Sequence, residues 1–572
     1  MVRSLPRNAE LAERFELLAD LLELDGADAF RLAAYRRAAA RIRESAVSVA
    51  ELALEGKAQR LSGIGGTIEQ KIAELARTGD LEALAKLRQR IPLGLVDVMR
   101  VPGLGPKTAR KLWKELGVET AEQLRAAAEQ GLLRGVPGLG EKTEQNVLAH
   151  FARPPERASR DGRALLGTVL PFVEAVVSEL ASHPAAVRVS EAGSVRRRTE
   201  TVRDLDVIAT ATDPAALIEH FVTRPWVAEI VARGPTKATV VGHDGLRFDL
   251  RVVPPECYGN LLQHFTGSKD HNVALREEAV RRGLSVSEYG VEEVATGAVT
   301  TMATEQELYA HLGYAWIPPE LRENAGELEA ARAGTLPVLV ERRDVLGDLH
   351  VHTDWSDGKA TLEQMVAAAR ERGHRYVAIC DHAKRLKDGR LERQAEAIAA
   401  LNGRLEGIEV LSGVEVDIRA NGSLDLDDES LAARDWVVAS IHSGFRDPPA
   451  EIERRLLAAI EHPFVDCIGH PTGRKIGRRA PYDVDLEAIF ARAGETGTAL
   501  EINGQPDRLD LKDTQARLAA ESGVRIVVSS DAHSAGGLGY LDLAVSQARR
   551  AWLTAAQVVN TRPWAEIARR AR

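Results

Sequence analysis

The sequence of 572 residues is poor in cysteine and aromatic residues and has no long hydrophobic run. Its three cysteines, Cys257, Cys380 and Cys467, lie far apart and form no CxxC pair, so neither a disulfide framework nor a thiolate zinc knuckle is expected. No apolar stretch approaches the roughly 20 residues that a membrane helix needs. The N-terminal segment is amphipathic and contains acids, unlike a secretory signal. We therefore expect a cytoplasmic protein without a membrane partner.

The sequence also lacks the basic excess that is typical of nucleic-acid-binding proteins, because its net charge is −9. Charge acts locally, however, and the first third of the chain carries basic clusters at 35–43 and 109–114. The overall charge therefore excludes no nucleic-acid partner. A hydrophobic fraction of 44% indicates a globular chain, and the length suggests about four domains of roughly 150 residues each.

A glycine-containing pattern recurs in the N-terminal part of the chain, where short amphipathic helices are expected. Residues 61–75, 101–116 and 136–150 share an apolar-x-Gly-apolar-Gly core that opens a helix. Such a turn presents backbone N–H groups that bind phosphate without reading a base. One copy would favour a plain helix–helix turn, whereas three copies favour DNA binding by helix-hairpin-helix motifs. The predicted DNA-binding residues are Gly63, Gly65, Gly103, Gly105, Lys107, Gly138, Gly140 and Lys142.

Three aspartates lie in apolar, strand-like segments after about residue 160. Asp204 and Asp206 are two residues apart, so both carboxylates point to one face of a strand, and Asp249 lies in the middle of another strand. Burying such groups is costly unless cations balance them. Three carboxylates can hold two divalent ions, which activate an attacking 3′-hydroxyl group and stabilise a leaving pyrophosphate. The alternative, an acid-capped strand end, is common for a lone Asp-x-Asp but leaves Asp249 without an explanation.

Upstream of these acids, Gly193 and Ser194 are followed by arginines at 196–198, which can receive the phosphates of a nucleotide. The order of the hairpins, Gly-Ser, Asp-x-Asp, a further Asp and the segment "HFTGSKDHN" (264–272) closely resembles family X DNA polymerases. This is the repair group that includes polymerase beta. The resemblance covers roughly residues 1–320.

This resemblance implies that the three aspartates bind two Mg²⁺ or Mn²⁺ ions and that Ser194 and Arg197 contact the triphosphate. It places Phe265 and Gly267 along the sugar of the incoming nucleotide. The residues that it places beside the nucleotide, the nascent base pair or the template are Gly193, Ser194, Arg197, His264, Phe265, Gly267, Asn272 and Arg276. His264 stands where vertebrate members carry tyrosine, a departure that concerns discrimination against ribonucleotides.

The same resemblance raises a second activity in the N-terminal helices. Lys71 matches the lysine that forms a Schiff base with 5′-deoxyribose phosphate, and Tyr35 matches a companion in that pocket. A lysine can act in this way only when its amine is neutral. A lysine on a DNA-facing helix is the alternative, and Gln59 and Thr67 stand where relatives with lyase activity have lysines.

After about residue 345, strand-like and helical segments alternate, which predicts a parallel sheet or barrel. The stretch "GDLHVHTDWSDG" (347–358) opens this part, and more histidines and acids follow at the ends of strand-like segments, where βα barrels carry catalytic groups. One such histidine is more often structural, but a full set indicates a metal centre. Imidazole and carboxylate together suit Zn²⁺, Mn²⁺ or Fe²⁺. The predicted ligands are His350, His352, Asp357, His382, Glu415, His442, His470, Asp531 and His533.

These positions match the ligand motifs of the PHP (polymerase and histidinol phosphatase) domain, which the chain closely resembles from about 340 to 572. The resemblance implies a distorted (βα)7 barrel with a trinuclear metal site, and the set of residues can bind two or three ions. In bacterial family X polymerases it implies a phosphoesterase, typically a Mn²⁺-dependent 3′→5′ exonuclease. We predict that Cys467, three residues before His470, belongs to the core, and that His374 and His462 are surface residues.

The predicted fold class is therefore multidomain, α+β and α/β. It combines helical helix-hairpin-helix domains, a mixed β palm of the nucleotidyltransferase type and a PHP barrel. The predicted domains are a helical DNA-binding domain similar to the 8-kDa lyase domain (1–88), a helix-hairpin-helix domain (89–155), the palm (156–255), a nucleotide-selection domain (256–320), a linker (321–340) and the PHP domain (341–572).

The leading interpretation is a bacterial, nucleoid-associated, monomeric enzyme that fills gaps in DNA and processes 3′ ends, with gapped or nicked DNA and deoxynucleoside triphosphates as partners. One alternative makes the front half a DNA-binding module for a phosphoesterase, which requires an inactive aspartate triad. A second makes the PHP domain a structural brace, which requires lost ligands. A small-molecule phosphatase leaves the DNA-binding motifs unexplained.

Overall fold

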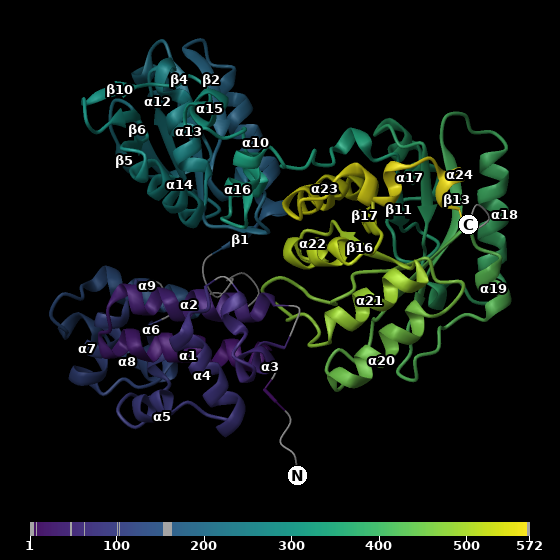
Figure 1. The fold of residues 1–572 in the computed structure, drawn as a ribbon, viewed down its shortest axis with the longest axis horizontal. Coiled ribbons are helices and arrows are strands. Elements are labelled where there is room, and N and C mark those ends of the chain that lie inside the picture. Colours follow the sequence, from purple (N-terminus) through teal and green to yellow (C-terminus); the bar gives the residue numbers. More distant parts are fainter. Residues whose placement is uncertain are drawn as a thin grey trace. The chain divides into compact units, whose positions relative to one another are not determined.

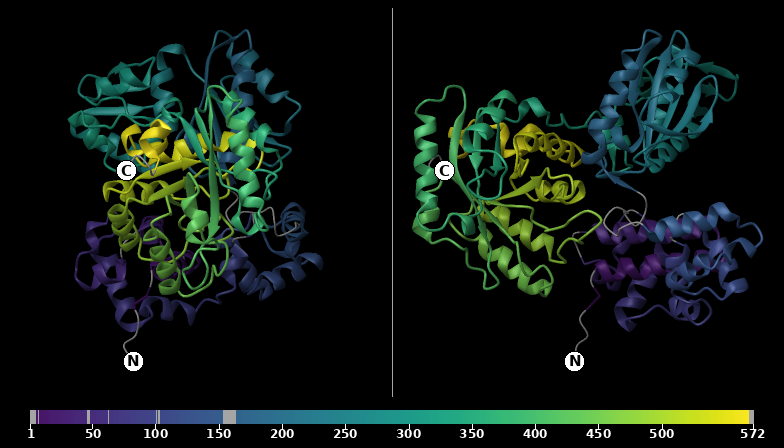
Figure 2. Two further views of the ribbon diagram at one scale, coloured as in Figure 1. Left: turned by 90° about the vertical axis from the view of Figure 1, so that its right-hand side faces the viewer. Right: turned by 180° about the vertical axis from the view of Figure 1, so that it is seen from behind.

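The computed structural model contains two compact units, and each is presented separately. Figures 1 and 2 show them in sequence colours, from purple at the start of the first unit to yellow at the end of the second. The first comprises the described residues up to 152 and residues 483–487, and the second comprises 163–482 and 488–568. The structure describes residues 5–568 apart from Arg7, 46–47, Ser62, Arg100, Pro102 and 153–162.

The first unit is built from helices around one hydrophobic core. Apolar residues at helical spacing, such as Leu11, Phe15 and Leu18, pack with buried residues from each of the other helices. The helices are α1 (Asn8–Asp25), α2 (Ala29–Glu44), α3 (Val49–Leu54), α4 (Gly66–Thr78), α5 (Glu82–Arg88), α6 (Leu95–Met99), α7 (Pro106–Leu116), α8 (Ala121–Glu129) and α9 (Glu141–Ala152).

The three glycine-containing turns of this unit share one backbone geometry. Gly63, Gly103 and Gly138 have φ angles of +86°, +87° and +85°. Each turn is closed by a backbone hydrogen bond of 2.9 to 3.0 Å, from Ile64 to Leu61, from Leu104 to Val101 and from Leu139 to Val136. A β-carbon at these glycines would meet nothing within 4 Å, so the left-handed backbone and not a lack of space requires glycine.

The second unit begins with a mixed five-stranded sheet, the palm, in the order β2-β4-β7-β6-β5. Strands β4 and β7 are parallel, and the other neighbours are antiparallel. The elements of this part are β1 (Ala164–Leu165), α10 (Leu166–Ala181), β2 (Ala186–Glu191), α11 (Gly193–Arg196), β3 (Thr201–Val202), β4 (Asp204–Ala211), α12 (Pro214–Val222), β5 (Val227–Arg233), β6 (Lys237–Gly242) and β7 (Arg247–Val252).

Side chains of β4 alternate between the two faces of the palm sheet, as the period of a strand requires. Leu205 and Val207 are fully buried in the core that α10 and α12 form on one face. Asp204, Asp206 and Ile208 point to the other face, where Ile208 packs in a second cluster. This alternation leaves the acids on the side of the sheet away from the main core.

Helices and a small antiparallel sheet follow the palm. The elements are α13 (Tyr258–Thr266), α14 (Lys269–Arg281), β8 (Leu284–Ser287), β9 (Gly290–Glu293), β10 (Ala298–Thr300), α15 (Glu305–His311), the short helix η4 (Pro319–Leu321) and α16 (Glu327–Ala333). Helix α16 lies in the segment 321–340, where composition suggested a linker. Leu328 and Ala331 of this helix are buried against Leu308, so tertiary packing and not local sequence makes this segment regular.

The remainder of the second unit is a seven-stranded parallel sheet in the order β11 to β17. A parallel bridge joins Val351, the last residue of β11, to Ala532, which follows β17, so the sheet is a nearly closed barrel, as predicted. The strands are β11 (Gly347–Val351), β12 (Tyr376–Ile379), β13 (Glu409–Asp417), β14 (Trp436–Ser440), β15 (Cys467–Ile468), β16 (Ala499–Asn503) and β17 (Ile526–Ser529).

Helices lie around the outside of these strands (Figure 2). Met365 of α17 and Ile398 of α18 pack with Val351 and Val377 of the strands. The helices are α17 (Leu362–Glu371), α18 (Arg390–Asn402), α19 (Asp428–Ala432), α20 (Pro449–Ile460), α21 (Leu486–Thr496), α22 (Asp513–Glu521), α23 (Leu541–Arg550) and α24 (Trp564–Ile567).

Two predictions about single residues of the barrel have different outcomes. Cys467 is 1% exposed and lies in the core beside Trp436, as predicted. The prediction that His374 is a surface residue is wrong, because it is 2% exposed and its Nε2 lies 3.1 Å from Arg342 Nη2. Burial and the charges of Arg342 and Arg372 lower the pKa of His374 to about 3. Among the described residues, no helix has the length and apolar content to cross a membrane.

Replacing Gly103 by alanine should weaken DNA binding, because an L-residue is strained at φ +87° by roughly 1–2 kcal/mol. Gly56 provides a matched control, since it has φ +70° and equally open surroundings but lies outside the three turns. We expect both variants to lose similar thermal stability, and only Gly103→Ala to lose affinity for a gapped duplex in fluorescence anisotropy. Equal loss of affinity in both variants would contradict a specific role of the turn.

Candidate active sites

The palm carboxylates lie on the parallel strand pair β4 and β7. Asp206 is directly opposite Asp249 in the register, and Asp204 is opposite Arg247. Neighbouring strands are about 4.8 Å apart, so residues in register have adjacent side chains on one face. Arg247 Nε lies 3.1 Å from Asp249 Oδ2, and the Thr239 hydroxyl donates to Asp249 Oδ1. The strands therefore gather the three acids, and protein groups orient Asp249.

The electrostatics of Asp206 fit a bound cation. Burial raises the pKa of Asp206 to about 7, and the charges of Asp249 and Asp204 add to the effect. Gly193 has φ +61° and lies against the same carboxylate, where a β-carbon would be 2.5 Å from Asp206 Oδ2. A half-buried carboxylate among like charges is stabilised by a positive ion. Hard divalent ions such as Mg²⁺ prefer oxygen donors of this kind.

Arg197 lies in the turn that leads from α11 toward β4 and contacts the segments after the palm. Its Nε donates to Glu323 Oε1 at 2.9 Å, and its Nη1 donates to the carbonyl oxygen of Thr266 at 2.9 Å. The turn itself is closed by a bond from Thr199 N to Ser194 O at 3.1 Å. The structure thus places Ser194 and Arg197 in one compact turn beside Gly193.

His264 and Arg276 form a hydrogen-bonded pair. His264 Nδ1 lies 2.8 Å from Arg276 Nη2 and 3.7 Å from Glu288 Oε2. Burial and the Arg276 charge lower the pKa of His264, so the ring is neutral and can accept the bond from the guanidinium group. The next residue, Phe265, carries the Arg251 guanidinium 4.5 Å above its ring.

Asn272 connects the end of α13 to α14. Its Nδ2 donates to the carbonyl oxygens of His264 and Gly267 at 2.8 and 3.2 Å, and its Oδ1 accepts from Gln263 Nε2 at 2.9 Å. A β-carbon at position 267 would lie 2.5 Å from Asn272 Oδ1, so this close approach requires glycine. The structure therefore brings the nucleotide-contact residues predicted between 264 and 276 together at the α13–α14 junction.

In the helical unit, the glycines of the three turns are exposed at the starts of α4, α7 and α9, and Lys107 is exposed beside the second turn. The side chain of Lys142 lies outside the described part of the structure. Lys71 is half-buried on α4, whereas Tyr35 is 4% exposed and packs against Phe15 with ring centroids 6.1 Å apart. Gln59 Nε2 donates to Glu69 Oε2 at 2.6 Å.

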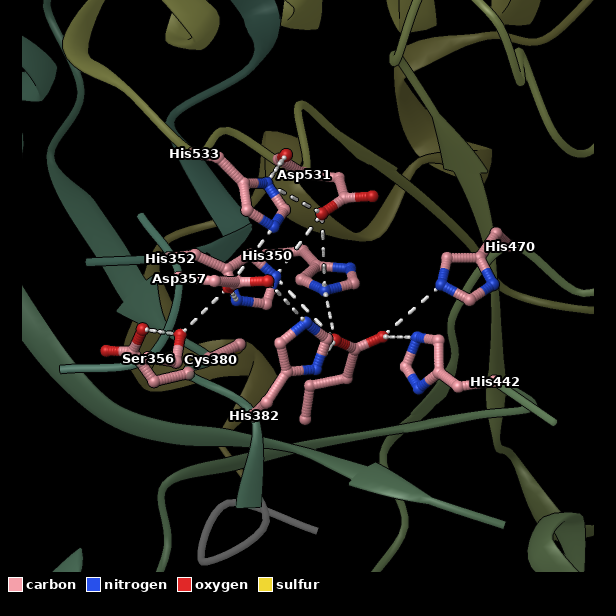
Figure 3. Close-up of polar contacts among 12 residues, drawn as sticks. His350, His352, Ser356, Asp357, Cys380, His382, His442, His470, Asp531 and His533 are labelled. Carbon is pink, nitrogen blue, oxygen red and sulfur yellow. Dashed lines mark hydrogen bonds and ion pairs between the residues drawn. The ribbon is translucent and has the colours of Figure 1, made fainter. Parts of the chain in front are cut away.

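All the metal ligands predicted in the barrel lie in one cluster (Figure 3). Their ligand atoms form overlapping groups, each within 4.8 Å. These groups are His352, Asp357, His382 and His533; His350, His352 and Asp531; His382, Asp417 and His442; and Glu415, His442 and His470. The ligands come together because parallel strands end at the same rim of the barrel.

Glu415, near the end of β13, is the centre of the cluster. Its Oε2 lies 2.8 Å from His382 Nδ1 and 3.7 Å from His352 Nε2. Its Oε1 lies 3.3 Å from the Nε2 atoms of both His442 and His470. The carboxylate therefore faces imidazoles on both sides, the arrangement of a bridging ligand.

The unpaired atoms of the cluster fit metal ions. Among the described residues, His350 Nε2, both ring nitrogens of His352 and Glu415 Oε1 are buried without a hydrogen bond, although carboxylate or imidazole groups lie within 4 Å of each. Burial opposes the charged imidazole, yet Asp357 and Glu415 raise the pKa of His382 to about 10. The acids around this ring thus favour a positive charge at this place, which bound cations would supply.

Two ligand positions have strained backbones. His470 has φ +32° and Asp531 has φ +51°, a region that residues other than glycine seldom occupy. Such strain persists only where the surroundings impose it, and it concentrates at functional sites. Figure 3 shows the side chains of both residues at the shared cluster.

Sequence reasoning missed the carboxylates that orient the histidines. Asp417 Oδ1 lies 2.6 Å from His442 Nδ1, and Glu501 Oε1 lies 2.7 Å from His350 Nδ1. Such partners hold the ring of a ligand and set its tautomer. Asp417 follows Glu415 by two residues on the same strand face, and Glu501 interrupts the apolar strand β16, so both left a signal in the sequence.

Four family models match the chain. A helix-hairpin-helix domain matches residues 6–81 and a SAM-like helix-hairpin-helix tandem matches 95–153. The DNA polymerase beta thumb matches 261–323, and the PHP domain matches 348–505.

The chain is similar to proteins of at least two kinds. The DNA polymerase/3′-5′ exonuclease PolX of Bacillus subtilis (strain 168) is 39% identical over 570 residues, which cover 98% of each chain. Probable phosphatases match the C-terminal part alone. One from Thermoanaerobacter sp. (strain X514) is 33% identical over 226 residues, which are 37% of this chain and 89% of that protein. One from Shewanella sp. (strain MR-4) is 32% identical over 209 residues, which are 35% of this chain and 81% of that protein.

Asp417→Asn should lower the affinity of the cluster for Mn²⁺ or Zn²⁺ by about 10- to 100-fold, because it weakens the bond that orients His442. Asp428→Asn is the matched control, because Asp428 also pairs with a histidine but is exposed and lies outside the metal cluster. Its Oδ1 atom is 3.3 Å from His462 Nε2. Calorimetric titration with the metal would measure the affinity of each variant. Equal affinities for the wild type and Asp417→Asn would exclude this orienting role.

Proposed function

Because the chain belongs to the bacterial family X DNA polymerases that carry a C-terminal PHP domain, we propose that its two sites act on the same 3′ ends of gapped DNA. It is a DNA polymerase and a 3′–5′ exonuclease. In this proposal the palm extends the 3′ end by one nucleotide at a time, and the PHP centre removes nucleotides or blocking groups from it.

At the palm, Asp204, Asp206 and Asp249 would hold two Mg²⁺ or Mn²⁺ ions, which would lower the pKa of the 3′-hydroxyl group and neutralise the charge of the leaving pyrophosphate. Ser194 and Arg197 receive the triphosphate in the turn after Gly193. The residues proposed to position the nucleotide and the template are His264, Phe265, Gly267, Asn272 and Arg276. The assignment is supported by the Asp206–Asp249 register and by the raised pKa of Asp206.

At the PHP centre, the cluster around Glu415 would hold two or three Mn²⁺, Zn²⁺ or Fe²⁺ ions, which would supply hydroxide and polarise the scissile phosphodiester. The chain's own contribution is to orient these ligands through Asp417 and Glu501 and to separate the imidazoles by a central carboxylate. A purely structural barrel would not need a complete ligand set, and here every predicted ligand reaches the cluster.

The observation that carries the proposal is the presence of both centres in one chain that matches a DNA polymerase/3′-5′ exonuclease over 98% of its length. The helix-hairpin-helix turns would hold gapped or nicked DNA by its backbone, and deoxynucleoside triphosphates would be the second substrate. We also propose that the enzyme works as a monomer in the cytoplasm at the nucleoid, since each centre is complete within one chain.

A 5′-labelled primer on a gapped duplex with Mn²⁺ tests both activities in one gel. Asp204→Ala/Asp206→Ala should lower extension by roughly 1,000-fold or more and keep primer shortening. His350→Ala/His352→Ala should lose shortening and keep extension, so each double variant is the control for the other. If no protein shortens the primer, the PHP centre does not act on DNA 3′ ends. If none extends it, the polymerase assignment fails.

A second proposed activity is 5′-deoxyribose phosphate lyase, supported by the position of Lys71 on α4 directly after the first glycine turn. Borohydride trapping on incised abasic DNA should cross-link the wild type, and Lys71→Ala should lose most of the product. Lys57→Ala is a matched control, because Lys57 is a surface lysine paired with Glu55 at 2.7 Å in the same unit. Full cross-linking by Lys71→Ala would remove this residue from the role.

A further inference from the structure

Arg550, the last residue of α23, is a PHP-barrel side chain that reaches the turn of residues 193–199 in the palm, which we call the nucleotide turn. Its side chain is 10% exposed. Its Nη1 donates to the carbonyl oxygen of Arg197 at 2.8 Å and to Glu323 Oε1 at 3.0 Å. Its Nε and Nη2 lie 2.8 and 2.7 Å from Asp513 Oδ2. In Figure 1, α23 lies on the side of the barrel that faces the palm.

Glu323 connects this arginine to the nucleotide site. The same Oε1 atom of Glu323 that accepts from Arg550 also accepts from Arg197 Nε at 2.9 Å. Asp513, Arg550, Glu323 and Arg197 therefore form a continuous chain of alternating charges from the barrel to the palm.

Binding of a triphosphate changes the charge partners within this series of side chains. Arg197 must turn its charge toward phosphate, and Glu323 then loses one of its two cations. A partly buried carboxylate that loses its only counter-charge is costly, whereas one that keeps a second cation is not. Arg550, fixed by Asp513, remains in contact with Glu323, so the exchange of partners by Arg197 leaves no uncompensated acid.

We propose that Arg550 is a positioning residue for the incoming nucleotide, supplied to the polymerase site by the PHP domain. It compensates Glu323 and holds the backbone of Arg197 in place. This inference rests on the proposed role of Arg197 as a triphosphate contact. It gives the PHP barrel a part in nucleotide binding that is separate from its own metal centre.

Neighbouring contacts support a built junction at this place. Gln547, 1% exposed on the same helix, donates from Nε2 to the carbonyl oxygen of Arg198 at 3.4 Å. Helix α23 also packs against η4, where Arg549 Nε donates to Glu320 Oε1 at 2.7 Å. Arg549 contacts no residue of the nucleotide turn in the hydrogen bonds of the described chain, which makes it a matched control.

Steady-state extension of a one-nucleotide gap would test the role with Arg550→Ala, Arg550→Lys, Arg549→Ala and Arg197→Ala. We expect Arg550→Ala to raise the KM for deoxynucleotide about tenfold or more while kcat at saturating nucleotide changes little. Arg550→Lys keeps the positive charge but lacks the planar guanidinium group with its several donors. Its KM should therefore lie between those of the wild type and Arg550→Ala. Arg549→Ala should keep the wild-type KM, and primer shortening should persist in all four variants.

The outcomes separate this inference from the proposed function. If Arg197→Ala raises the KM and Arg550→Ala does not, the positioning role is overturned while the nucleotide site stands. If Arg197→Ala leaves the KM unchanged, the triphosphate assignment itself fails. Should Arg550→Ala not fold, Asp513→Asn, which keeps the side-chain volume and frees Arg550, gives the same test. An unchanged KM in Asp513→Asn and Arg550→Lys would also overturn the inference.

Discussion

Compensation of buried charge is the constraint that both catalytic centres share. Asp206 is close to the like charges of Asp204 and Asp249, and Glu415 is surrounded by imidazole rings inside the barrel. Isolated charges of this kind destabilise a fold, so each must meet an opposite charge or an ion. In the function proposed above, divalent ions would provide that charge in the palm and in the barrel. The same demand explains why these sites are built on strands, whose positions are precise enough to hold the groups close together.

The structural ion pairs of the second unit follow the same rule without metal. Glu305 is almost fully buried, which opposes its charge, yet Arg322 and Arg196 lower its pKa to about 2. Asp513 is buried beside Arg550, and their pairing keeps both groups charged. Removing one partner of such a pair costs far more than the pair contributes, because it leaves the other charge buried. These buried ion pairs therefore connect segments that are far apart in the sequence.

The two centres differ in chemistry because they differ in ligands. Carboxylates alone suit hard ions, and the candidate ligands on β4 and β7 are all carboxylates. The barrel combines imidazole and carboxylate, which suits Mn²⁺, Zn²⁺ or Fe²⁺. A chain with both sets of ligands can build a phosphodiester bond at one centre and hydrolyse one at the other.

The sequence by itself determined the features that depend on local periodicity. Asp204 and Asp206 share a face because a strand repeats every two residues, and the glycine turns recur because a φ angle near +87° strains any residue with a β-carbon. His350 and Glu415 could be predicted since parallel strands end at one rim. Only the tertiary structure decided that Arg550 meets Arg197, that His374 is buried and that 321–340 contains a packed helix. These contacts join residues distant in sequence, and no local pattern encodes the partner across such a distance.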